Sequence, residues 1–138
     1  MPASRSLHVS SPLLPMLVAV LLIGASARSA AALEEGNFGF ETTKDLYTVC
    51  SADADNPAYA SAQVACTAFI EATMQYHDAV SDRKRMKRLV CYPQGTSIAD
   101  GRQAFISWAE KNATNAQRMG EMPVVCLVRA LAAAYPCK

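Results

Sequence analysis

Residues 56–80 read NPAYASAQVACTAFIEATMQYHDAV, and they carry the clearest structural signal in the chain. Asn56 followed by Pro57 is a favourable helix start, because Asn can cap the first turn and Pro lacks an N–H that this turn would leave unbonded. Side chains that can be buried then recur every three or four positions, which is the spacing of one helix face. They are Tyr59, Ala62, Cys66, Phe69, Ile70, Thr73, His77 and Val80. We therefore predict a long helix from Pro57 to about Val80, with Cys66 on its buried face.

Capping residues and apolar periodicity predict three shorter helices around this one. One begins near Thr43, the next is capped by Ser97, and the last runs from Pro123 to just before Pro136. The core stripe of the last helix is expected to be Val124, Leu127, Val128, Leu131 and Tyr135. The lead-in at residues 36–40 and the polar stretch before Pro123 read as loops, and no strand alternation is evident. The expected fold class is all-α, a bundle of about four helices.

The beginning of the chain has the pattern of a signal peptide. A weakly basic start precedes an uncharged apolar run at residues 13–23, which is too short for a membrane span. Small residues follow, with cleavage signals ending at Ala27 and Ala32, of which we favour the second. The alternative, an uncleaved amphipathic anchor, is disfavoured because a basic residue ends the apolar run early. We expect residues 1–32 to be removed on export, leaving a single domain at 33–138 with no membrane insertion.

Composition and motifs exclude several classes of function. A length of 138 residues fits one domain, and a formal net charge of +1 gives no support for nucleic-acid binding. The chain contains no nucleophile elbow, zinc-protease motif or glycine-rich phosphate loop. His77 lies on the buried stripe, where a satisfied core histidine is a simpler interpretation than a base or ligand. We therefore expect no enzyme activity, no metal and no cofactor.

Five cysteines lie beyond the expected cleavage site: Cys50, Cys66, Cys91, Cys126 and Cys137. An exported protein enters an oxidising compartment, so two structural disulfides and one odd thiol are expected to staple the bundle. No Cys-x-x-Cys pair is present, which disfavours a zinc site and a thioredoxin-like redox motif. Fifteen ways of forming two pairs from five cysteines remain open.

The strongest electrostatic feature is a basic run formed by Arg83, Lys84, Arg85, Lys87 and Arg88. One interpretation is a solvated helix end, where cations suit the negative pole of the helix dipole. The other is a patch that steers an acidic protein surface or an anionic envelope polymer.

Four short motifs together carry a family resemblance. They are Leu46-x-x-x-Cys50, Ala65-Cys66-x-x-Phe69-Ile70, Val90-Cys91-Tyr92-Pro93-Gln94-Gly95-Thr96-Ser97, and Ala130-Leu131-Ala132-Ala133-Ala134-Tyr135-Pro136-Cys137. In this order they resemble the type VI secretion amidase immunity proteins, the Tai and Rap group of small exported helical proteins. The similarity extends from about Leu46 to Cys137.

The resemblance implies a periplasmic helical domain, often a homodimer, that binds and occludes a secreted peptidoglycan amidase effector. It also implies pairing of Cys50 with Cys66 and of Cys91 with Cys137. The alternative function is a small periplasmic helical binding protein or stress chaperone without a cognate toxin. Gly101 and the basic run depart from the family pattern, and we expect them where partner-facing variation lies.

Cys126 is expected to mark a second packing face on the last helix. At 100° per residue it points nearly opposite the predicted core stripe, beside small residues that permit close approach of another helix. The possible dimer face comprises Cys126, Arg129, Ala130 and Ala133. A buried, inert thiol within one chain is the alternative interpretation.

Overall fold

The computed structural model describes residues 33–83 and 86–138. A short 3₁₀ helix is followed by five α-helices and, in the described residues, no extended strand; the expected all-α fold is confirmed. The elements are η1 (Glu35–Gly39), α1 (Thr43–Cys50), α2 (Tyr59–Arg83), α3 (Ile98–Asn112), α4 (Ala116–Gly120) and α5 (Pro123–Ala134). The expected leader, residues 1–32, lies outside the described residues.

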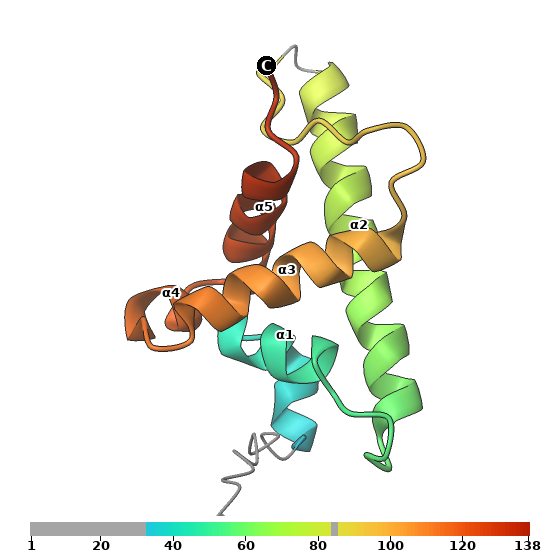
Figure 1. Ribbon diagram of the computed structural model, residues 1–138, viewed down its shortest axis with the longest axis vertical. Coiled ribbons are helices and arrows are strands. Elements are labelled where there is room, and N and C mark those ends of the chain that lie inside the picture. The colour runs from blue at the N-terminus through green and yellow to red at the C-terminus, as the bar shows by residue number, and fades with distance from the viewer. Residues whose placement is uncertain (1–32, 84–85) are drawn as a thin grey trace, which may run out of the picture.

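The long helix α2 extends along the longest axis of the molecule, and α3 crosses it (Figure 1). Its buried residues are Ala62, Cys66, Ile70, Thr73 and Ser81, a stripe close to the predicted one. The helix starts two residues later than expected, because Asn56 forms a turn in which its side chain accepts a hydrogen bond from the Ala58 N–H at 2.9 Å. At the other end α2 continues past Val80 to Arg83.

The eight-residue helix α1 contacts η1 and every other α-helix. Its N-cap is Thr42, one residue before the predicted start, and Thr42 and Asp45 cap each other reciprocally. The buried Thr43 hydroxyl donates to the Glu121 carbonyl at 2.9 Å, which ties α1 to the junction of α4 and α5. Arg102 of α3 donates from Nε to the Cys50 carbonyl at 2.8 Å, satisfying a carbonyl at the end of α1.

Two disulfides join Cys50 to Cys66 and Cys91 to Cys137, the pairs that the resemblance implies. The first fastens α1 to α2 inside the core, where both cysteines are fully buried. The second fastens the segment between α2 and α3 to the chain end, beside an isolated antiparallel bridge between Val90 and Pro136. Each closure restricts the unfolded chain and stabilises the fold by about 3–4 kcal/mol.

Two elements were not expected from the sequence, η1 and α4. Each has five residues, which is too short for apolar periodicity to be recognised. Phe40 ends η1 in a left-handed conformation, with φ of 49°, and its ring packs against Phe69 of α2 with centroids 5.0 Å apart. Asn115 caps α4 by accepting from the Arg118 N–H.

Gly101 lies in the first turn of α3 and faces side chains of α2 and α5. A Cβ at this position would meet Ile70 and Met74 of α2 and Leu131 of α5 at 3.5–3.6 Å. The residue is buried, so the expectation that it faces a partner is wrong. It belongs to the core.

Replacing Gly101 with Ala is expected to stabilise the protein by about 0.5–1 kcal/mol, because Ala restricts the unfolded chain and the new methyl meets neighbours at ordinary contact distance. Gly101→Leu is expected to overpack the same space and to destabilise by about 1–3 kcal/mol. Urea unfolding of the oxidised protein measures both changes. A destabilising Ala variant would contradict the packing described here.

Candidate functional site

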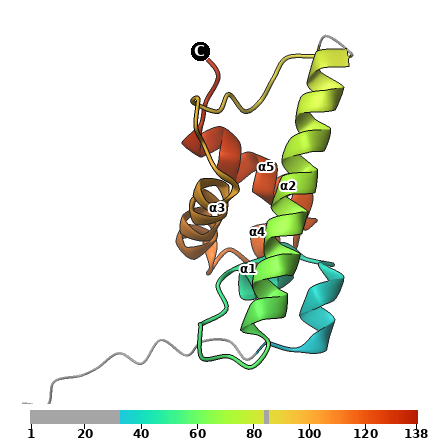
Figure 2. The same cartoon turned by 90° about the vertical axis from the view of Figure 1, so that its right-hand side faces the viewer.

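The segment after α2, residues 86–92 and here called the strap, is held against the rest of the molecule at several points. Figure 2 shows its path from the end of α2 toward the C-terminus. The Met86 N–H donates to the Ser81 carbonyl at 3.1 Å, and the Cys91 N–H donates to the Tyr135 carbonyl at 2.9 Å. Together with the Cys91–Cys137 disulfide, these bonds fix an otherwise irregular stretch of chain.

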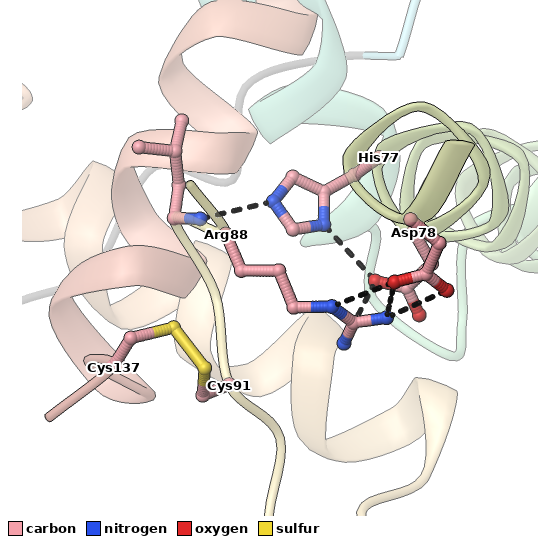
Figure 3. A network of polar contacts seen from close by, with 7 residues as sticks. His77, Asp78, Arg88, Cys91 and Cys137 are labelled. Atoms are coloured by element: carbon pink, nitrogen blue, oxygen red, sulfur yellow. Dashed lines mark hydrogen bonds and ion pairs between the residues drawn. A yellow bond between two sulfur atoms is a disulfide. The ribbon is translucent and has the colours of Figure 1, made fainter. Parts of the chain in front are cut away.

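His77 of α2 forms the central contact of the strap (Figure 3). Its imidazole, with a side chain 9% exposed, has both ring nitrogens engaged. Nδ1 lies 3.0 Å from Asp78 Oδ1, and Nε2 accepts a hydrogen bond from the Leu89 backbone N–H at 3.3 Å. This is the satisfied histidine expected from the sequence, and its partners are a carboxylate and a strap amide.

Arg88 is part of the same network and folds back onto α2 (Figure 3). Its guanidinium donates to both carboxylate oxygens of Asp82 at 3.1 and 3.2 Å and lies 3.6 Å from Asp78 Oδ1. The hydrogen bond to Asp82 raises the pKa of Arg88 above its already high value. Arg88 therefore pairs with carboxylates of its own chain, and the role of the basic run in steering a partner stays a prediction.

The other members of the basic run are placed differently. Arg83 and Lys87 are exposed, and Lys84 and Arg85 lie outside the described residues. Two large apolar side chains are exposed in the strap, Met86 at 55% and Leu89 at 56%. The end of α2 and the strap, here together called the edge, thus combine positive charge with apolar surface in their described residues. Arginine and apolar side chains are common at protein interfaces.

The core side of the strap contains Tyr92. Its ring lies 5.7 Å from that of Tyr135, and its hydroxyl is buried with no hydrogen-bond partner among the described residues. Burial, followed by the nearby Asp78 carboxylate, raises the pKa of Tyr92 to about 12, so the phenol stays neutral at physiological pH.

A second surface feature is an open apolar groove of about 550 Å³ between α2 and the start of α5. Tyr76, 71% exposed, and Met122, 65% exposed, stand at its sides. The groove is lined by Phe40, Glu41, Phe69, Ala72, Thr73, Tyr76, Met122, Pro123 and Val124. Sequence reasoning missed it because residues from three separate segments form it.

The structure corrects the predicted dimer face on α5. Cys126 and Ala130 are buried within the chain, whereas Arg129 and Ala133 are exposed. α5 is apolar on nearly all sides. Its buried face includes Leu127 and Leu131 of the predicted core stripe and extends to Cys126, on the side that was assigned to a dimer contact. The Cys126 thiol lies 3.4 Å from the Arg118 carbonyl of α4 and 3.3 Å from Arg129 Nη1.

No group of three or more potential metal ligands occurs within residues 33–83 and 86–138. In the same part of the chain, none of the helices combines the length and the apolar character needed to cross a bilayer.

The fold defines a class, the small helical domains held by two disulfides. A family model described as Rap1a immunity proteins matches residues 42–137, so the chain belongs to this family, a type VI secretion amidase immunity family. The match includes both disulfides, the strap and every α-helix. Comparisons with curated proteins and with solved structures find no match.

Cys126 is expected to be unreactive in the native protein. Burial raises the pKa of this thiol, which lowers the thiolate fraction, and the surrounding helices block access to it. Labelling with a thiol-specific reagent should be at least about tenfold slower in buffer than in denaturant. A covalent dimer through Cys126 on a non-reducing gel, or native labelling as fast as in the unfolded chain, would contradict this placement.

Proposed function

We propose that this chain is a periplasmic immunity protein that binds a secreted peptidoglycan amidase effector of a type VI secretion system and occludes its active site. The family match over residues 42–137 carries the proposal, because this family implies binding to a secreted effector. An occluding protein needs a rigid complementary surface and no catalytic residues of its own.

Two features support an extracytoplasmic site of action. The protein has two disulfides, and disulfides are typical of oxidising compartments and rare in the cytosol. The signal-peptide pattern of residues 1–32 is consistent with export.

We propose that the effector contacts the edge formed by Arg83, Lys87 and the exposed apolar side chains of the strap. The segment is already ordered by its disulfide and hydrogen bonds, so binding would cost little further conformational entropy. Its positive charge would favour an acidic surface on the effector and would accelerate encounter. The homodimer implied by the resemblance stays a prediction. The face centred on Cys126 is no longer proposed as its interface, because Cys126 is buried within the chain.

Purified mature protein is expected to inhibit the type VI amidase encoded beside its gene, and its export is expected to protect cells that produce that amidase in the periplasm. The measurements are muropeptide release from isolated cell walls and growth, with a version lacking residues 1–32 as the localisation control. Full amidase activity at a tenfold excess of the protein would refute the proposal. Suppressed aggregation of an unrelated unfolding protein, without amidase inhibition, would favour the chaperone alternative.

Reversing Arg83 and Lys87 to Glu is expected to slow association with the amidase about three- to tenfold at low salt, with the difference shrinking above physiological salt. Stopped-flow or surface-based kinetics across ionic strength provides the test. Lys44→Glu with Lys111→Glu, two exposed sites on other elements, is the matched control with the same change in net charge. Equal slowing in both double variants would point to overall charge and would exclude a local patch.

A further inference from the structure

The strap has one reversible contact whose chemistry depends on pH. The Leu89 N–H can only donate to His77 Nε2 while that nitrogen carries a lone pair. The imidazole is then neutral with its proton on Nδ1, which donates to Asp78 at 3.0 Å. The observed conformation of the strap, here called closed, therefore requires the neutral form of His77.

Uptake of a proton at Nε2 changes the two contacts in different ways. The Nδ1–H bond to Asp78 persists and becomes charge-assisted, and it joins neighbours on α2 whether or not the strap is in place. At Nε2, however, the new N–H points at the Leu89 N–H, so two donors face each other and the hydrogen bond is lost. Of these two contacts, the one to the strap opposes protonation and the one to Asp78 favours it.

Of the titratable groups around the strap, His77 is the one whose change of charge would alter the strap contact. Asp78 and Asp82 lie on α2 and are both engaged by Arg88 of the strap. The other titratable groups nearby are Tyr92 of the strap and Tyr135, whose ring packs against that of Tyr92. Histidine is the side chain whose ordinary charge change falls between pH 5 and 8, and the imidazolium would also repel the Arg88 guanidinium.

We infer that His77 is an acid-sensitive latch, which in its neutral form holds Leu89 and the strap closed and on protonation releases them. The closed state requires the neutral imidazole and is lost when acid protonates Nε2. Release frees the exposed Lys87 and Leu89 from fixed positions, whereas the Cys91–Cys137 disulfide keeps the far end of the strap attached.

The latch can be tested by amide hydrogen exchange and imidazole ¹⁵N shifts of the oxidised protein alone, so its failure would leave the proposed function untouched. Between pH 7.5 and 5.0 the protection factor of the Leu89 amide is expected to fall about five- to tenfold, in line with loss of one hydrogen bond. The Cys91 amide, bonded to the Tyr135 carbonyl beside the disulfide, is the internal control and should keep its protection.

Two variants separate the latch from a general loss of stability. His77→Gln keeps a neutral acceptor near the Nε2 position and should retain Leu89 protection at both pH values, whereas His77→Phe should show low protection at both. In the wild type, ¹⁵N shifts should show the proton on Nδ1 at pH 7.5. A proton on Nε2 at that pH, equal Leu89 protection at both pH values, or parallel loss at Leu89 and Cys91 would overturn the latch.

Discussion

The packing of α1 across α2 is the interaction on which the other elements depend. An eight-residue helix is too short to be stable in water by itself, so its contacts with neighbouring elements must hold it. Cys50 is joined covalently to Cys66, its carbonyl is bonded by Arg102, and Thr43 is bonded to the α4–α5 junction. Every other helix packs against α1, so losing its position would open the core from the centre.

The two disulfides act at different levels of the structure. The buried Cys50–Cys66 bond fixes the arrangement of helices, and a domain of this size gains from such a covalent link because its core is small. The Cys91–Cys137 bond lies at the edge and fixes the strap, a segment whose backbone has few helical or sheet hydrogen bonds. The first bond therefore maintains the scaffold, and the second maintains the surface that we propose for binding.

The sequence predicted the elements that have a cap and a repeating apolar face. Ser97 illustrates this success: it caps α3 and exchanges hydrogen bonds with Asp100, whose pKa these bonds lower. The disulfide pairing followed from family resemblance, since cysteine spacing left it open. The inner face of α5 was predicted only in part, at Leu127 and Leu131, because apolar residues surround this helix. Arg88 lies beyond the end of α2 and folds back onto carboxylates within that helix, a contact that helical periodicity does not predict.

The strap combines a permanent anchor with reversible ones, and this division suits a binding surface. Its disulfide end cannot dissociate in an oxidising compartment, which limits the entropy lost when a partner binds. Its α2 end is held by non-covalent contacts, the ion pairs of Arg88 and the hydrogen bond from the Leu89 N–H to His77. Such an edge is ordered enough to recognise a shape, and its exposed side chains, Lys87 and Leu89, lie at the end that only non-covalent contacts hold.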